Sequence, residues 1–362
     1  MRLAARLALA AMVIAMLAAQ AADARVIRTV APASELVEGP VLAGARVAWE
    51  ERRCPGQPKC GFDVSARYLI RAAGPRGTVT LNRGRTRSAP GGENAFFSSV
   101  SFDLSARRFA LARSVVSVLS EEETGEAKLS VGGRDGGGLR QLLACKRAFA
   151  VDNPYALSSD LIAYDPNPCD ELPRLAVRNL ATGGTRDIEL GPPGETLSAV
   201  AIAGRYVAHL RGATVALHDR VTGAELFSAA LPQGTAHGID VARDGRLAVS
   251  VGSPLLAGRT CWQSRLWVLR AGGDVLEEQA ARPCWDARLT ATGVAYLRGG
   301  RRPTALVHAD TAGATRAIVR FGERPAWQDF DAQGARAAYG VRCEGRMLIR
   351  VVTLGASHPA CG

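Results

Sequence analysis

The stretch Ile239-Asp-Val-Ala-Arg-Asp-Gly-Arg-Leu-Ala-Val249 contains two short apolar segments joined by an Asp-Gly turn. Alternation of apolar with other residues is typical of strands that each bury one face. Gly accepts the positive φ that a tight hairpin turn requires, so Asp-Gly favours a hairpin at this point. The stretch therefore predicts an antiparallel β-hairpin whose second strand carries an apolar-Ala-apolar sequence.

The hairpin recurs along the chain. Seven copies align on one alanine of the second strand, and successive copies are 40 to 62 residues apart. The aligned alanines are Ala48, Ala110, Ala163, Ala208, Ala248, Ala295 and Ala338. A small residue at a fixed strand position indicates close packing of one sheet against the next.

A second hairpin follows every copy except the last, as in Thr214–Phe227 and Ala305–Val319. Each unit then has four strands, A to D, which matches a blade of a β-propeller. The seventh unit has a strand C at Met347–Leu354 but no strand D, and Arg25–Val30 supplies a matching strand. We predict an all-β fold, a β-propeller of seven four-stranded blades closed by pairing of the N-terminal strand with the C-terminal blade. Six or eight blades also fit the uneven spacing.

Two segments carry a family resemblance. Val241-Ala-Arg-Asp-Gly-Arg-Leu-Ala-Val-Ser250 resembles the first turn of TolB-like and WD-repeat-like β-propellers, and Val177–Arg186 resembles their second hairpin. The resemblance extends over the whole chain after residue 24, without a Gly-His…Trp-Asp signature. It implies a propeller that serves as an interaction platform, and it implies no catalytic residue.

Residues 1–24 have the features of a signal peptide. Arg2 and Arg6 precede an apolar run from Leu7 to Ala19, and Ala22-Asp-Ala24 is a suitable cleavage site. We therefore expect cleavage after Ala24, a single propeller domain over residues 25–362 and an extracytoplasmic protein, secreted or in the cell envelope. An uncleaved membrane anchor is the alternative.

Eight cysteines follow the signal peptide, and export makes disulfides the expected state. In a propeller, the B–C loops and D–A connections lie on one face, here named the loop face, and the A–B and C–D turns lie on the turn face. All eight cysteines can be placed on the loop face, in B–C loops, D–A connections or the C-terminal tail. The predicted pairs are Cys54–Cys60, Cys145–Cys169, Cys261–Cys284 and Cys343–Cys361. Zinc is the rival interpretation, but the spacings lack a Cys-x-x-Cys pair.

The starts of the A strands should surround the mouth of the central channel on the loop face. Aromatic and polar side chains there suggest a ligand-binding mouth. Its candidate residues are Glu38, Tyr155, His237, Trp285, Asp286, Trp327 and Asp329. Packing of Trp285 on the adjacent disulfide is the structural alternative. His209, His218 and His308 lie within strand patterns and are expected to be ordinary strand residues.

The sequence contains no nucleophile elbow, phosphate-binding loop or zinc-protease motif. We therefore predict a non-catalytic binding or interaction scaffold for envelope proteins or glycans, without cofactor or metal ion. The alternative is an exported lyase or glycoside hydrolase that uses Asp286, Asp329 and Glu38 in the channel mouth.

The formal net charge is +11, and the densest basic cluster is Arg83, Arg85 and Arg87. We interpret this cluster as a solvated loop rather than a nucleic-acid site, and a basic protein could still adhere to anionic envelope polymers. We expect a monomer with no nucleic-acid partner and no stable membrane insertion after cleavage. Asp165–Glu171 fits a disulfide loop better than a calcium site.

Overall fold

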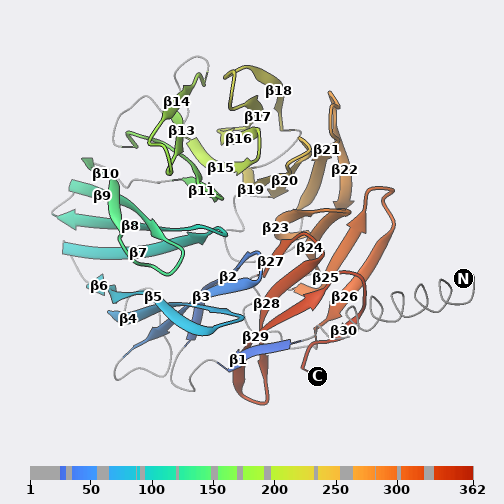
Figure 1. Ribbon diagram of the computed structural model, residues 1–362, viewed down its shortest axis with the longest axis horizontal. Helices are drawn as coiled ribbons and strands as arrows, with labels where there is room; N and C mark the ends of the chain where they lie inside the picture. The colour runs from blue at the N-terminus through green and yellow to red at the C-terminus, as the bar shows by residue number, and fades with distance from the viewer. Residues whose placement is uncertain are drawn as a thin grey trace, which may run out of the picture.

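The computed structural model describes residues 25–29, 35–54, 65–86, 88–89, 94–119, 122–147, 154–168, 174–190, 197–231, 235–252, 264–281, 283–299, 303–321 and 330–361. All regular secondary structure in these residues is β-strand, and the strands form seven sheets around a common axis (Figure 1). The predicted signal peptide lies outside the described residues. A search of the described part for a helix capable of crossing a membrane found none.

The first three blades are consecutive along the chain. Their strands are β2 (Glu35–Ala43), β3 (Arg46–Arg53), β4 (Ala66–Gly74) and β5 (Gly77–Thr86) in blade 1; β6 (Ser88–Ala89), β7 (Asn94–Leu104), β8 (Arg108–Leu119), β9 (Glu122–Gly133) and β10 (Arg140–Arg147) in blade 2; and β11 (Tyr155–Ser158), β12 (Leu161–Tyr164), β13 (Leu175–Asn179) and β14 (Thr185–Ile188) in blade 3.

The remaining blades follow the same order, and blades 6 and 7 also take strands from the chain ends. Their strands are β15 (Leu197–Ala203), β16 (Tyr206–Arg211), β17 (Thr214–Asp219) and β18 (Glu225–Ala230) in blade 4; β19 (Thr235–Val241), β20 (Leu247–Gly252), β21 (Arg265–Leu269) and β22 (Leu276–Ala281) in blade 5; β23 (Pro283–Thr290), β24 (Gly293–Gly299), β25 (Pro303–Asp310), β26 (Thr315–Arg320) and β30 (His358–Pro359) in blade 6; and β27 (Phe330–Gln333), β28 (Arg336–Cys343), β29 (Arg346–Thr353) and β1 (Arg25–Thr29) in blade 7.

The N-terminal strand closes the ring. β1 pairs antiparallel with β29, with Arg25 opposite Val351 and Thr29 opposite Leu348. This pairing confirms the predicted closure and provides blade 7 with its outer strand. The edge of β29 is therefore covered by the chain's own N-terminal strand rather than left open to another molecule.

The hydrophobic core is divided among the blade interfaces. Seven buried clusters each join two neighbouring blades, including one between blades 7 and 1. All seven repeat alanines are at most 1% exposed, which agrees with the close sheet packing that the repeat predicts. A larger side chain at this strand position would press against the neighbouring blade.

The hairpin turns follow the predicted chemistry. Gly44 and Gly204 have φ values of 60° and 58° in A–B turns, and Ser159 has a φ of 55° at the equivalent point of blade 3. Positive φ is sterically accessible to Gly and costs Ser some strain. The turn residues therefore explain why the repeat has Gly at this point in several blades.

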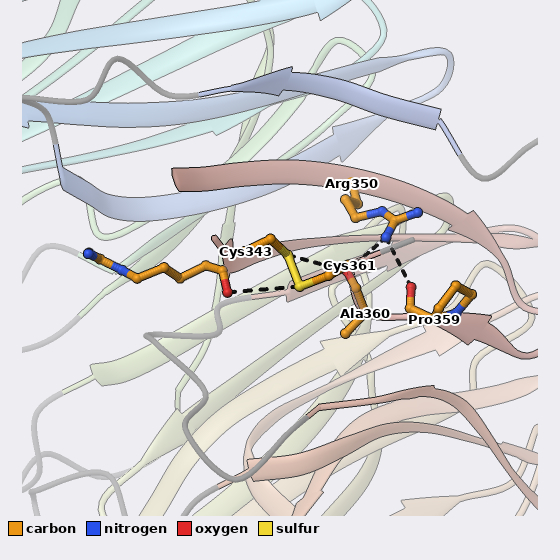
Figure 2. Close-up of a disulfide and its surroundings, with 6 residues drawn as sticks. Cys343, Arg350, Pro359, Ala360 and Cys361 are labelled. Carbon is orange, nitrogen blue, oxygen red and sulfur yellow. Dashed lines mark hydrogen bonds between the residues drawn. A yellow bond between two sulfur atoms is a disulfide. The ribbon is translucent and has the colours of Figure 1, made fainter. Parts of the chain in front are cut away.

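The C-terminal tail is attached to blades 7 and 6, and Figure 2 shows its contacts with Cys343 and Arg350 of blade 7. The disulfide Cys343–Cys361 joins the end of β28 to the tail, with a Cα–Cα distance of 5.6 Å. The buried guanidinium of Arg350 donates from Nη1 to the carbonyl oxygens of Pro359 and Ala360 at 3.0 and 2.8 Å. Beyond this predicted bridge, β30 pairs parallel with β26 and so extends blade 6, which the sequence did not indicate.

Three other cysteines, Cys54, Cys145 and Cys284, are described, and two of them lie elsewhere than predicted. Cys145 lies within β10 and Cys284 within β23, so neither lies in a connection as predicted. Both strands extend further toward the loop face than the alternation of the sequence indicated. Cys54, Cys145 and Cys284 are disulfide-bonded, and their predicted partners, respectively Cys60, Cys169 and Cys261, lie outside the described residues.

The basic cluster is also placed differently. Arg83 and Arg85 lie in β5, the outer strand of blade 1, and not in a loop. Arg87 lies outside the described residues. The prediction of a loop was wrong because β5 continues beyond Leu81, where the apolar alternation of the sequence ends.

Candidate functional site

One position of each inner strand lies directly opposite a repeat alanine. Seven inner strands, β2, β7, β11, β15, β19, β23 and β27, surround the axis (Figure 1). The residues opposite the alanine are Val41, Asp103, Ala156, Ala201, Asp240, Arg288 and Asp331. Four of the seven are charged, so the middle of the ring carries three carboxyl groups and one guanidinium.

Each of these aspartates is bonded to the next blade. Asp103 Oδ2 accepts the N–H of Leu157 in blade 3 at 2.8 Å, and Oδ1 accepts the N–H of Leu104 at 2.7 Å. Asp240 repeats this arrangement with Leu289 of blade 6, at 2.6 Å. The inner strand of a blade is an edge strand, so its inward N–H groups have no strand partner. The aspartate of the preceding blade supplies the missing acceptor.

The third aspartate closes the ring at the junction between blades 7 and 1. Asp331 Oδ2 accepts the N–H of Leu42 at 2.6 Å, and Oδ1 accepts the N–H of Ala332 at 2.9 Å. Arg288 Nε also donates to Asp331 Oδ1 at 3.1 Å, from the equivalent position of blade 6. We name Asp103, Asp240, Asp331 and Arg288 the axial charge cluster.

The cluster has unusual titration behaviour. Burial raises the pKa of Asp103 and of Asp240 to about 6, against the opposing effect of their backbone hydrogen bonds. Burial also raises the pKa of Asp331, and the neighbouring Arg288 opposes that rise. The charge of Asp331 also contributes to the raised pKa of Asp103 and of Asp240.

The geometry limits the chemistry of this cluster. Both carboxylate oxygens of each aspartate accept backbone N–H groups, one from the aspartate's own strand and one from the next blade. In the described residues, no group of three His, Cys, Asp or Glu side chains converges closely enough to hold a metal ion. The cluster therefore acts first as a set of clamps between blades.

Most of the sequence-predicted mouth residues lie on inner strands, at the loop-face end. Glu38 lies on β2, Tyr155 on β11, His237 on β19, and Trp285 and Asp286 on β23. Tyr155 is the one whose side chain is described, and its hydroxyl lies 3.4 Å from Ser101 Oγ of blade 2. Trp327 and Asp329 lie outside the described residues. The side chains of Glu38, His237, Trp285 and Asp286 are likewise not described.

The backbone is irregular at Glu38, His237, Trp285 and Asp286, whereas β11 pairs in regular register at Tyr155. The register of β19 with β20 shifts between Ala236 and Gly238, which places His237 in a bulge. The register of β23 with β24 shifts between Cys284 and Ala287, which places Trp285 and Asp286 in a second bulge. β2 shifts on both sides of Glu38. Bulges redirect side chains and are frequent beside binding and active sites.

The axial charge cluster was not predicted from the sequence. A usable signal is present, because an apolar-Asp-apolar triplet occurs at the same repeat position in Phe102–Leu104, Ile239–Val241 and Phe330–Ala332. The aspartate recurs in only three of the seven copies, so it marks the repeat less clearly than the alanine opposite it. His209, His218 and His308 are buried strand residues, as expected.

Seven sheets of four principal strands, closed by the N-terminal strand, define the class of this protein as a seven-bladed β-propeller. No protein-family model and no curated protein sequence matches the chain.

Three solved structures are similar to this chain at low sequence identity. The β-propeller domain of Cps50 (Swd1) from Myceliophteria thermophila is 13% identical, with a TM-score of 0.47 over 91% of this chain and 100% of that domain. U3-55K is 11% identical, with a TM-score of 0.39 over 71% of this chain and 77% of that one. An ACO/RPE65 chimera is 13% identical, with a TM-score of 0.37 over 68% and 61% of the two chains.

Proposed function

We propose that this chain is an exported, non-catalytic β-propeller, with one domain over residues 25–362, that binds envelope proteins or glycans at its loop face. The observation that carries the proposal is the coincidence of bulged inner strands in blades 1, 5 and 6 with the aromatic and polar mouth residues. The strand pairing is interrupted at the loop-face end of these strands. Because bulges redirect side chains, the interruptions support a binding mouth at that end of the ring.

The axial charge cluster supports binding rather than catalysis. A glycoside hydrolase or lyase needs a carboxyl group that is free to give or take a proton beside the substrate. The carboxyls that the structure describes near the axis are occupied by backbone N–H donors from two blades. Burial is the main cause of the raised pKa of Asp103, Asp240 and Asp331, so a catalytic role is not needed to explain it.

Two features support export. None of the described cysteines is free, which fits an oxidising compartment. β1 begins at Arg25, so cleavage after Ala24 would leave the whole closing strand in the mature chain. The resemblance to TolB-like propellers belongs to the same proposal and favours the cell envelope as the place of action.

The binding mouth is tested with isolated cell-envelope material. Purified protein should bind the envelope fraction, and the double variant Trp285→Ala and Trp327→Ala should lose that binding with an unchanged circular dichroism spectrum. Tyr206→Ala removes an aromatic ring at the turn face and is the matched control. Equal binding by wild type and the Trp285/Trp327 variant contradicts the mouth. Release of soluble sugar by wild type, but not by Asp286→Asn, would favour the enzyme instead.

The extracytoplasmic location is tested separately. Fractionation of expressing cells should recover the chain outside the cytoplasm with Arg25 as its first residue. Peptide mapping without reduction should recover Cys54–Cys60, Cys145–Cys169 and Cys261–Cys284 as linked pairs. A cytoplasmic protein with Met1 still present would contradict the proposed export.

A further inference from the structure

Arginine side chains are in direct register across the outer strands of blade 1. Arg67 of β4 lies opposite Arg85 of β5 on one side and opposite Arg53 of β3 on the other. Directly paired residues of antiparallel strands have Cβ atoms about 4.5–5.5 Å apart. Arg83 lies two residues before Arg85 and therefore on the same face of β5. Three neighbouring strands thus bring four guanidinium groups together.

Arg53, Arg67, Arg83 and Arg85 are all exposed. Within the described part of the chain, Arg67, Arg83 and Arg85 form no ion pair or side-chain hydrogen bond. Glu51 lies on the same face but is buried. Its Oε1 accepts a hydrogen bond from Trp49 Nε1 at 2.9 Å and lies 3.5 Å from Arg71 Nε in an ion pair. Like charges directly opposite one another destabilise a sheet unless an anion lies between them.

The position of this group connects it with the proposed binding face. β3 ends and β4 begins at the B–C loop, and β5 ends at the connection to blade 2. Arg53, Arg67 and Arg85 therefore lie at the loop-face end of their strands. We name Arg67, Arg83 and Arg85 the basic edge. It lies on the same face of the ring as the proposed mouth.

We propose that the basic edge binds an acidic glycan, a polymer whose sulfate, phosphate or carboxylate groups recur along its length. This inference rests on the proposed function and specifies one partner of the loop face. Arginine forks bind such oxyanions through paired N–H groups, and β4 and β5 together present three forks within one short span.

The surroundings of the basic edge favour a glycan over other polyanions. Single-stranded nucleic acid requires aromatic platforms for its bases, but the two described aromatic residues of blade 1, Trp49 and Tyr68, are 0% and 2% exposed. An anionic membrane surface requires apolar side chains that insert. In the described chain, the exposed large apolar residues, Val79, Val221, Leu226 and Val275, lie at or near C–D turns and thus toward the turn face.

The experiment measures binding of the full mature chain to dextran sulfate, with neutral dextran of the same length as the uncharged probe. The variant Arg67→Gln with Arg85→Gln should weaken binding at least tenfold, and the slope of log affinity against log salt should fall by about 1.4 to 1.8 in magnitude. The control Arg76→Gln with Arg243→Gln removes the same charge from exposed turn-face positions and should change affinity less than twofold. Arg67→Lys with Arg85→Lys restores the charge and should recover most of the affinity.

Several results would overturn the inference. Equal losses in the Arg67/Arg85 and Arg76/Arg243 variants would show a diffuse effect of net charge. Tighter binding to poly(dT) or to anionic lipid vesicles than to dextran sulfate would assign the edge to another partner. Envelope binding that persists when Arg67 and Arg85 are replaced refutes the basic edge alone, whereas a wild-type chain that binds no envelope fraction refutes the proposed function.

Discussion

Replacement of Asp103 by Asn should change the pH dependence of stability in a defined direction. The substitution removes the negative charge and leaves a carbonyl oxygen that can still accept the N–H of Leu157. In the folded chain burial raises the pKa of Asp103 to about 6, whereas 3.8 is the value of the unperturbed group. The folded protein therefore binds a proton at this site more readily than the unfolded chain.

The sign and size follow from that difference in pKa. The contribution of Asp103 to stability is fully present below pH 3.8 and is lost as the pH rises through 6. A pKa raised from 3.8 to about 6 corresponds to roughly 3 kcal/mol at most. The free energy of unfolding of wild type minus that of Asp103→Asn should therefore increase by up to about 3 kcal/mol between pH 7.5 and pH 4.

Urea denaturation, followed by tryptophan fluorescence at intervals of half a pH unit with the disulfides intact, measures this difference. Asp187→Asn, at an exposed position of β14, is the control for a change of one charge. A difference between wild type and Asp103→Asn that stays constant with pH, or grows toward alkaline pH, would refute the assignment of Asp103 as a buried clamp.

Three further predictions concern other parts of the ring. Ala208→Leu places extra methyl groups at a position that is 0% exposed and should cost about 1–3 kcal/mol of unfolding free energy in urea; an unchanged midpoint contradicts close blade packing. Burial lowers the pKa of His209 to about 3, so its contribution is lost as the pH falls below 6.5; His209→Phe should gain stability over wild type by about 1.4 kcal/mol per pH unit below that value, and parallel curves would exclude this. Cys361→Ser removes the disulfide between two residues 18 apart and should lower the free energy of unfolding by about 3 kcal/mol, measured by thermal unfolding. When both proteins are fully reduced, wild type and variant should be equally stable. An oxidised variant as stable as oxidised wild type would contradict the prediction.

The fold was predictable because its determinants are local and repeated. Ala208 and its six equivalents mark a buried strand position in every copy, and Gly residues mark where several of the hairpins reverse. The closing strand was predictable because Arg25–Val30 is an alternating segment with no partner of its own in the first blade. Each of these features can be recognised in a short window of sequence.

The site was predictable only in part because it depends on contacts between blades. Asp103 lies 54 residues from the N–H of Leu157 that it accepts, and no local pattern specifies that bond. Bulges at His237 and Trp285 arise from the register of strand pairing, which alternation alone does not determine. Arg67 and Arg85 are neighbours only because β4 and β5 pair. The cluster of Arg83, Arg85 and Arg87, which is defined by proximity in the sequence, therefore does not include Arg67.

The pairing of β1 with β29 has a consequence for biosynthesis. Residues 25–29 are synthesised before every other strand of the ring, yet the strand they join at 348–351 is made only after the strands of the first six blades. The four principal strands of those six blades can therefore pair in order as the chain grows, but the seventh blade must wait until residues 348–351 are available. Until then a nascent chain carries one unmatched strand ahead of its first blade, and this interval is the period of greatest exposure to pairing with the wrong molecule.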